Sequence, residues 1–270
     1  MKIRISTDWW KTMFDEIYLL TDARSVCDPD ITSREVDLIC KLLSIKVKNS
    51  ILDLCGGHGR HSLELCARGF NKCTLLDYSG YLLDCARAKA ADHNYPIELI
   101  QADARSIGLA SESFDHVIIM GNSLGYIGER DADRQILTEA KRVLCSGGWF
   151  VVDVANGTRV KESFNPRAWH EIGQDIVVCR ERSIEGDSLY AREMVLSKKD
   201  GIIRDCSYGI HLYEPQGLEM LMKEIGFRKI KIYTDFSPHK GEGDYGFMNH
   251  RMLGVGRKLK KIGEPQEQTV

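Results

Sequence analysis

The chain has 270 residues, enough for one α/β domain with an insertion or for a domain with a small subdomain. Its 37 basic and 39 acidic residues give a formal net charge of −2, so no overall basic field favours nucleic acid as a partner. The chain has no run of eighteen apolar residues, no apolar signal segment at its start and no Cys-x-x-Cys pair among its nine cysteines. We therefore expect a cytoplasmic protein with reduced thiols, without a membrane span or a metal site.

Residues 1–45 are predicted to form helices that cover the rest of the domain. An apolar stripe has helical spacing there, at Trp10, Met13, Phe14, Ile17 and Tyr18. This stripe fits either an ordinary packing helix or a lid over a ligand. Trp9 and Trp10 are adjacent and cannot both face one core, so one of them is expected to cover a pocket or an edge. Further along, Thr32 and Glu35 have the spacing of a capping box at the start of a second helix.

From residue 50 onward, short apolar runs alternate with segments of helical spacing. The runs predict five strands, at residues 51–54, 72–77, 97–102, 114–120 and 149–154. The segments between them predict helices at residues 61–68, 80–92 and 131–144. Continuous apolar strands separated by helices are typical of a parallel sheet that is covered on both faces.

The pattern changes between residues 157 and 213. Three extended runs, 175–184, 188–197 and 202–213, are separated by turn signals, and no convincing helix lies among them. They predict a small antiparallel β subdomain. Helical spacing returns at 215–225, and the last two predicted strands, 229–235 and 250–257, are joined by the loop 237–249.

The predicted fold is therefore an α/β, Rossmann-like doubly wound sheet of seven strands, with the last strand antiparallel. Its main domain comprises residues 1–156 and 214–260, and the β subdomain, residues 157–213, is inserted after strand five. The polar tail, residues 261–270, is expected to be flexible.

Three acidic residues lie at or just after the carboxyl ends of successive predicted strands, at the edge where open α/β sheets bind ligands. Asp53 precedes the glycine turn 56–59, and a carboxylate there would repel a pyrophosphate but attract a cation. Asp77 could accept hydrogen bonds from both hydroxyls of a ribose. Asp103 could accept from an adenine amino group, while the Ala104 N–H donates to the ring. These residues predict a site for a positively charged adenosyl ligand.

A nicotinamide-dependent dehydrogenase is the alternative, because Asp77 follows the glycine turn by about twenty residues, as the ribose acid of that class does. However, Ser62 stands where the third glycine of the Gly-x-Gly-x-x-Gly motif would be, and Asp53 would repel the pyrophosphate. This alternative also leaves Asp103 unexplained. The residues therefore favour the adenosyl ligand.

The motifs resemble those of the class I S-adenosylmethionine-dependent methyltransferases over nearly the whole chain. The matching segments are 52–61 (LDLCGGHGRH), 75–79 (LLDYS), 101–104 (QADA), 114–117 (FDHV) and 142–148 (RVLCSGG). The chain departs from the family's Gly-x-Gly-x-Gly pattern at Cys55, which replaces the first glycine. Within the family it is most similar to the small-molecule branch with an N-terminal covering helix and a β insertion after strand five.

The resemblance implies S-adenosylmethionine as the cofactor, S-adenosylhomocysteine as its product, and in-line methyl transfer to an N or O atom of a small molecule. We expect Arg60 to reach the carboxylate of the cofactor, unless it is a surface residue of the next helix. The expected cofactor contacts are Tyr18, Asp53, Cys55, Gly56, Gly57, Arg60, Asp77, Tyr78, Ser79, Asp103, Ala104, Arg105, Gly121 and Asn122.

The expected acceptor site draws on the N-terminal segment, the loop after the fourth strand and the insertion. Its candidate residues are Trp10, Phe14, Asn122, Tyr126, Arg180, Arg182, His211 and Tyr213. Arg180 and Arg182 share one strand face, which fits an anionic acceptor if that face points into the pocket. The other interpretation is a solvated face that also carries Glu181 and Glu193. The candidates for a general base are Tyr126, His211, Tyr213 and His239.

Two further functions fit the same motifs. One is a non-catalytic S-adenosylmethionine-binding protein with a regulatory or scaffold role, and the other is a methyltransferase that acts on a protein or an RNA. No Pro-Pro-Tyr-type motif follows the fourth predicted strand, which disfavours nucleic acid. The β insertion is expected to act as a substrate lid or as a dimer contact, so both a monomer and a homodimer fit.

Overall fold

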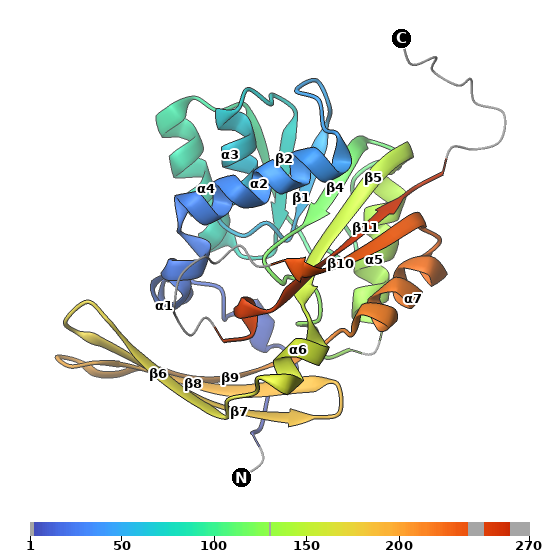
Figure 1. Ribbon diagram of the computed structural model, residues 1–270. Coiled ribbons are helices and arrows are strands. Elements are labelled where there is room, and N and C mark those ends of the chain that lie inside the picture. Colours follow the sequence, from blue (N-terminus) through green and yellow to red (C-terminus); the bar gives the residue numbers. More distant parts are fainter. Residues whose placement is uncertain (1–2, 130, 237–245, 260–270) are drawn as a thin grey trace.

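The computed structural model describes residues 3–129, 131–236 and 246–259 (Figure 1). His239, the tail 261–270 and most of the predicted loop 237–249 lie outside the described residues. The described chain forms a seven-stranded mixed sheet and a separate four-stranded antiparallel sheet.

The larger sheet has the strand order β10-β11-β5-β4-β1-β2-β3. Its strands are β1 (Ile51–Leu54), β2 (Cys73–Asp77), β3 (Ile97–Gln101), β4 (Phe114–Ile119), β5 (Leu144–Ala155), β10 (Arg228–Phe236) and β11 (Arg251–Arg257). All neighbouring strands are parallel except at β11, which is antiparallel to both β5 and β10. The predicted Rossmann-like α/β sheet of seven strands with an antiparallel last strand is confirmed.

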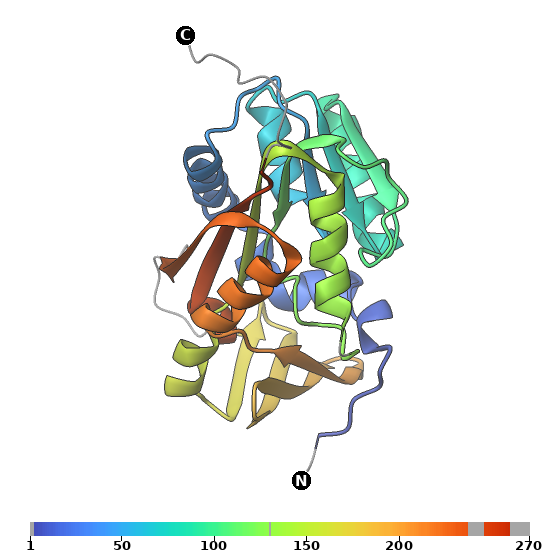
Figure 2. The ribbon, with the colours of Figure 1, turned by 90° about the vertical axis from the view of Figure 1, so that its right-hand side faces the viewer.

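Helices cover both faces of this sheet (Figure 2). They are α2 (Pro29–Leu43), α3 (Arg60–Ala67), α4 (Gly80–His93), α5 (Ala132–Val143) and α7 (Pro215–Ile225). Leu52 and Leu54 of β1 share a core cluster with α5 and α7, whereas Ile51 packs with α2 and α3 on the opposite face. Every residue of β1 is buried because both faces of the sheet are covered.

The N-terminal segment forms two helices where the apolar stripe predicts one. A short 3-10 helix, η1 (Trp9–Lys11), is followed by α1 (Glu16–Val26). Asp15 separates them, because its Oδ1 accepts hydrogen bonds from the Ile17 and Tyr18 N–H groups at 2.9 and 3.1 Å and so begins a new helix.

Helix α2 begins one turn earlier than the predicted capping box. Asp28 is its N-cap and accepts hydrogen bonds from two backbone N–H groups of the first turn, with Pro29 at the first helical position. The Thr32 hydroxyl donates to the Asp28 carbonyl, and Glu35 is fully buried. The predicted Thr32–Glu35 capping box is therefore wrong, and the Glu35 carboxylate binds charged side chains instead.

The second sheet has the order β6-β7-β8-β9. Its strands are β6 (Arg167–Ile172), β7 (Ile176–Glu185), β8 (Ser188–Ser197) and β9 (Gly201–His211). The three predicted runs are present, but the prediction missed β6 and the helix α6 (Gly157–Glu162). Asn156 caps α6 by accepting from the Arg159 N–H, and β6 leaves Trp169 71% exposed, so neither element has a strong apolar pattern.

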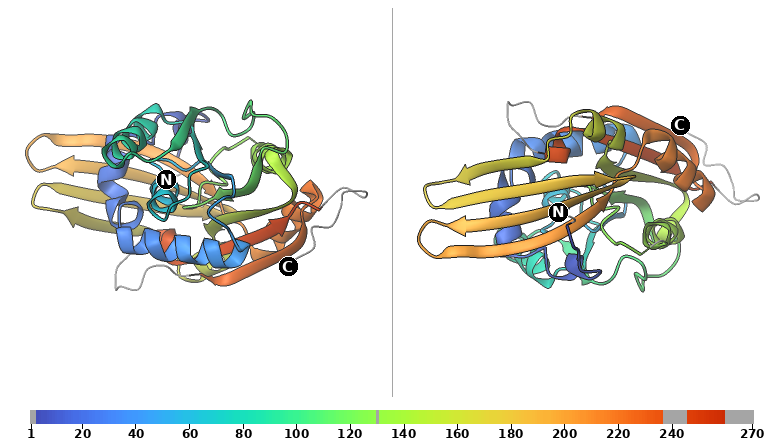
Figure 3. Two further views of the ribbon diagram at one scale, coloured as in Figure 1. Left: turned by 90° about the horizontal axis from the view of Figure 1, so that it is seen from above. Right: turned by 90° about the horizontal axis from the view of Figure 1, so that it is seen from below.

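The second sheet lies below the larger sheet in Figure 1, and in Figure 3 its hairpins reach past the rest of the molecule on one side. One of its faces packs on the N-terminal segment and on the end of β5. Leu189, Ala191 and Ile210 share a core cluster there with Trp9 and Ala155. The sheet thus forms a roof over the carboxyl ends of the central strands.

Candidate functional site

A cavity, the main cavity, opens at the carboxyl ends of β1, β2, β3 and β4, against the N-terminal segment. Its wall includes most of the expected cofactor contacts, namely Tyr18, Cys55, Gly56, Gly57, Arg60, Asp77, Tyr78, Asp103, Ala104 and Gly121. Of the acceptor candidates, Trp10, Phe14 and Tyr126 also line it. The fold therefore brings together side chains from four strand ends and from a segment that precedes all of them.

The loop after β1 meets the cavity with its backbone. Cys55, Gly57 and Gly59 have φ angles of 59°, 59° and 74°, in the left-handed region that favours glycine. A Cβ on Gly56 would lie 2.6 Å from Asp53 Cγ, so no side chain fits at that position. Cys55 keeps the left-handed conformation despite its side chain, and burial raises the pKa of its thiol well above the usual value, so the thiol is neutral.

Asp77 ends β2 on the wall of the main cavity. Its Oδ2 accepts a hydrogen bond from the Gly57 N–H at 2.7 Å, and its Oδ1 accepts from the Ser79 N–H at 2.8 Å. Burial raises the pKa of this carboxyl to about 6, although both N–H groups favour the ionised form. These bonds fix the carboxylate between the glycine loop and α4, and each oxygen retains a lone pair for a ligand.

Asp103 lies on the wall after β3, beside Trp10. Its Oδ2 accepts from Arg105 Nη2 at 2.7 Å, and this hydrogen-bonded guanidinium lowers the pKa of the carboxyl. The Arg105 guanidinium also pairs with Glu129 at 2.8 Å and lies 5.4 Å from the Trp10 ring centroid. The centroids of the Trp10 and Tyr78 rings are 4.8 Å apart. Trp10 therefore lies at this end of the cavity, but Trp9 and Trp10 are both buried in one core cluster, so the expectation that they cannot both face one core is wrong.

Asp53 lies behind the glycine loop and not on the cavity wall. It is fully buried, and its Oδ2 accepts a hydrogen bond from the Ser62 hydroxyl at 2.8 Å. Its Oδ1 has no hydrogen-bond partner. Burial raises the pKa of this carboxyl. In this geometry the Asp53 carboxyl lies one layer below the loop, and its direct contact with a ligand stays a prediction.

Three other expected cofactor contacts, Ser79, Arg105 and Asn122, also lie off the wall. The Ser79 hydroxyl donates to the Phe14 carbonyl at 2.6 Å and so ties the N-terminal segment to the end of β2. The Asn122 Oδ1 accepts from the Ala155 N–H at 2.6 Å and joins the ends of β4 and β5. These side chains support the wall because their polar groups are already bonded to the protein.

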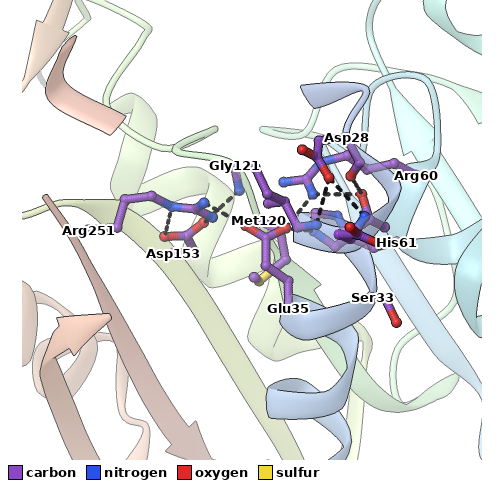
Figure 4. A network of polar contacts seen from close by, with 12 residues as sticks. Asp28, Ser33, Glu35, Arg60, His61, Met120, Gly121, Asp153 and Arg251 are labelled. Atoms are coloured by element: carbon purple, nitrogen blue, oxygen red, sulfur yellow. Dashed lines mark hydrogen bonds and ion pairs between the residues drawn. The ribbon is translucent and has the colours of Figure 1, made fainter. Parts of the chain in front are cut away.

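A buried charge network behind the wall was missed by the sequence analysis (Figure 4). Glu35 pairs with Arg60, with His61 Nε2 at 2.7 Å and with Arg251 Nη1 at 2.5 Å. Arg251 also binds Asp153, with a distance of 2.8 Å from Nε to Oδ1. Burial lowers the pKa of His61, so two carboxylates face two guanidinium groups and the charges balance.

This network reaches the main cavity at two points. Asp153 Oδ2 accepts from the Gly121 N–H at 2.8 Å, and Arg60 lines the cavity. A Cβ on Gly121 would lie 3.9 Å from Arg60 Nη2, so this nitrogen stands beside the end of β4. Arg60 is therefore not a surface residue. Its Nη1 pairs with Glu35, and its Nη2 lies near the wall of the main cavity.

A second cavity, the roof cavity, lies between the N-terminal segment and the second sheet. Arg180, Arg182 and Glu193 line it, and Arg182 and Glu193 are only 8% and 0% exposed. The interpretation of this strand face as solvated is therefore wrong. Glu181 alternates to the opposite, exposed face of β7.

His211 and Tyr213 line a third hollow and neither of the other two cavities. The Tyr213 hydroxyl donates to Asp133 Oδ2 at 2.6 Å, and the His211 ring lies 4.4 Å from the Tyr213 ring. Tyr126 lines all three spaces, and burial raises its pKa to about 12. Of the described candidates for a general base, only Tyr126 reaches the main cavity.

Within the described residues, no group of three or more His, Cys, Asp or Glu side chains is arranged to hold a metal ion. No helix in the described ranges is both long and apolar enough to span a membrane.

Comparisons with known proteins agree with this geometry. A family model described as "Methyltransferase domain" matches residues 51–148. A putative methyltransferase of Bacillus subtilis, YqeM, is 27% identical over 223 residues, which cover 81% of this chain and 88% of that protein. A glycine/sarcosine N-methyltransferase of Aphanothece halophytica is 25% identical over 232 residues, or 81% of each chain.

Solved structures share the fold. A S-adenosylmethionine-dependent methyltransferase from Clostridium acetobutylicum superposes with a TM-score of 0.73 at 18% identity, covering 91% of this chain and 97% of that chain. A sugar N-methyltransferase from a Streptoalloteichus species gives a TM-score of 0.65 at 19% identity, covering 91% and 94%.

Proposed function

The chain belongs to the class I S-adenosylmethionine-dependent methyltransferases, and we propose that it moves a methyl group from S-adenosylmethionine to a nitrogen or oxygen atom of a small molecule. The observation that carries this proposal is the main cavity, where Asp77, Asp103 and the glycine loop meet at three neighbouring strand ends. Proteins similar to this chain that are named as a glycine/sarcosine N-methyltransferase and a sugar N-methyltransferase favour nitrogen as the acceptor atom.

The residues of the main cavity fit this cofactor. The carboxylate of Asp77 can accept from both ribose hydroxyls while its backbone hydrogen bonds hold it in place. Asp103 and Ala104 stand where an adenine would be recognised, and Trp10 offers a ring at that end. The carboxyl of Asp53, buried below the glycine loop, offers no positive charge to a pyrophosphate, so its position favours a cation over a pyrophosphate.

The chemistry that the cofactor would supply is an electrophilic methyl group on a sulfonium, displaced in line by a lone pair of the acceptor. The protein's part is then to align the acceptor and to exclude water. Arg60 would hold the amino-acid carboxylate with the nitrogen that lies beside Gly121. Tyr126, with its pKa raised to about 12, is protonated at neutral pH and would position an acceptor without removing its proton.

The first test is ligand binding. In isothermal titration calorimetry we expect S-adenosylhomocysteine to bind with one site per chain, and NAD and ATP to bind far more weakly. Binding of NAD or ATP in place of the adenosyl compound would contradict the assignment of the main cavity.

The second test is turnover, which separates an enzyme from a non-catalytic binding protein. The protein is incubated with S-adenosylmethionine and pooled small amines, amino acids and amino sugars, and S-adenosylhomocysteine is quantified. We expect product above a no-acceptor control. Tight binding without any turnover would favour the regulatory or scaffold function.

A further inference from the structure

The roof cavity adjoins the main cavity. Phe14, Tyr18, Val26, Gly121 and Tyr126 line both spaces. Gly121 follows β4, so a molecule in the roof cavity lies directly beside the end of the sheet at which the cofactor is proposed to bind. The roof cavity is therefore the space next to the cofactor in which an acceptor could be held.

Aromatic side chains make the roof cavity a shielded space. The Trp9 ring centroid lies 5.5 Å from that of Tyr126 and 5.7 Å from that of Tyr208, and all three residues line the cavity. Met13 adds a further buried apolar group. Charges within such walls interact more strongly than charges at a surface, because little water screens them.

The two arginines in this cavity have different surroundings. Arg180 is bonded to Glu193 Oε2 at 2.7 Å and pairs with Asp22 at 3.4 Å. Arg182 is 8% exposed, its Nε has no hydrogen-bond partner, and no ion pair to it is found within the described residues. A buried guanidinium without a partner is costly, so its position on a cavity wall points to a ligand that pairs with it.

The remaining charges limit what that ligand can be. Asp22 and Glu193 balance the two arginines, and the Oε1 of Glu193 is buried without a partner. A dianionic group such as phosphate would be repelled by these two acids. A ligand with one carboxylate and one ammonium group has no net charge, so it would satisfy both Arg182 and the free oxygen of Glu193 while leaving the cavity neutral; the ammonium must lose a proton before its nitrogen can accept a methyl group.

We propose that Arg182 binds the carboxylate of the methyl acceptor, and that the acceptor is a small amine that carries a carboxylate. This inference rests on the proposed function, since it assigns the acceptor to the space beside the cofactor. The planar guanidinium suits a carboxylate because it donates two parallel hydrogen bonds. Arg182 thereby selects acceptors by charge, and the shared residues Gly121 and Tyr126 bring the acceptor to the cofactor.

The experiment measures binding without turnover. Protein loaded with S-adenosylhomocysteine is titrated with glycine, acetate, methylamine and inorganic phosphate, and dissociation constants are obtained by ligand-observed NMR. The proteins compared are the wild type, Arg182→Met, Arg182→Lys and Arg192→Met. Arg192 is the matched control, because it lies on the same sheet but pairs with Asp205, and both side chains are 38% exposed.

We expect glycine and acetate to bind the wild type and Arg192→Met equally, and Arg182→Met to bind them about tenfold or more weakly, as for the loss of a charged hydrogen bond. Arg182→Lys should recover part of the affinity. Equal binding by Arg182→Met, preference for phosphate over the carboxylates, or no binding of glycine and acetate to the wild type would overturn the proposal. Retained S-adenosylhomocysteine binding in each variant reports an intact fold, whereas its absence in the wild type would refute the proposed function instead.

Discussion

The main cavity and the roof cavity hold their charged side chains in different ways. In the main cavity, Asp77 is held by backbone N–H groups of Gly57 and Ser79, within two consecutive strand–helix units. Around the roof cavity, Arg180 is held by Glu193 of the neighbouring strand and by Asp22, which is 158 positions away in the sequence. The position of Asp77 therefore depends on local turns, whereas the pair of Arg180 with Asp22 and the charge network behind the main cavity depend on the packing of elements that are remote in sequence.

The largest effect on stability is expected when the buried charge network of Figure 4, whose members are remote in sequence, loses one partner. Glu35→Ala would leave Arg60 and Arg251 buried without their shared carboxylate. We expect the free energy of unfolding to fall by about 3–5 kcal/mol, the usual cost of removing one partner of a buried ion pair. Chemical denaturation monitored by circular dichroism measures this change.

The control lies on the same helix. Asp37 pairs with Arg68 but its side chain is 69% exposed, so Asp37→Ala should change stability by less than about 1 kcal/mol. Equal changes in the free energy of unfolding would show that the buried network stabilises the fold no more than an exposed ion pair does.

The main cavity is tested by Asp77→Ala. We expect S-adenosylhomocysteine affinity to fall by about 1–3 kcal/mol, because the ribose hydroxyls would lose their acceptor. Calorimetry measures the affinity, and Asp84→Ala, an exposed acid on the following helix, is the control. Unchanged affinity in Asp77→Ala would mean that the ribose binds elsewhere.

The pKa of Asp77 predicts a pH dependence of the same interaction. The pKa is raised to about 6, so the folded protein without ligand binds this proton more tightly than the unfolded chain, and the stability that this gives at low pH is lost as the pH rises from about 4 to about 6. Because the ionised form is the acceptor of both hydroxyls, S-adenosylhomocysteine affinity should fall about tenfold from pH 7.5 to pH 5.

Two variants test whether Asp77 is the group whose titration changes the affinity, and His58 is another titratable neighbour to consider. Burial lowers the pKa of His58, which also lines the main cavity, to about 4, so this imidazole stays neutral over the range tested. Asp77→Asn should remove the pH dependence, while Asp84→Ala should keep it. A pH dependence that persists in Asp77→Asn would assign the titration to another group.

The smallest effect is expected for Ser79, which connects the wall of the main cavity with the N-terminal segment. Ser79 caps α4 and donates to the Phe14 carbonyl, so it connects the local turn after β2 with the N-terminal segment. Ser79→Ala should reduce stability by about 1 kcal/mol and weaken cofactor binding severalfold. Thermal unfolding and calorimetry measure the two effects, and Ser163→Ala, whose hydroxyl donates to the Arg159 carbonyl of α6, provides the comparison. A loss of stability without a change in cofactor affinity would show that Ser79 caps α4 but does not contribute to the main cavity.

The sequence by itself determined the doubly wound sheet, the position of the glycine loop, and the acids Asp77 and Asp103 at successive strand ends. These features are local, because apolar periodicity, turn residues and strand-end positions each depend on a few neighbouring residues. The same reasoning placed Asp53 and Asn122 against the ligand, since it could not show that Asp53 lies behind the glycine loop, with one oxygen bonded to Ser62, or that the Asn122 oxygen is bonded to Ala155.

Only the tertiary structure decided which charges are buried and with whom they pair. Glu35 and Arg251 are separated by 216 positions, and their pairing leaves no periodic signal in either segment. The inward direction of Arg180 and Arg182 was equally undetermined, because a strand places alternate side chains on opposite faces but does not say which face is covered. Burial of a charge depends on the packing of distant elements, and that packing exists only in the folded chain.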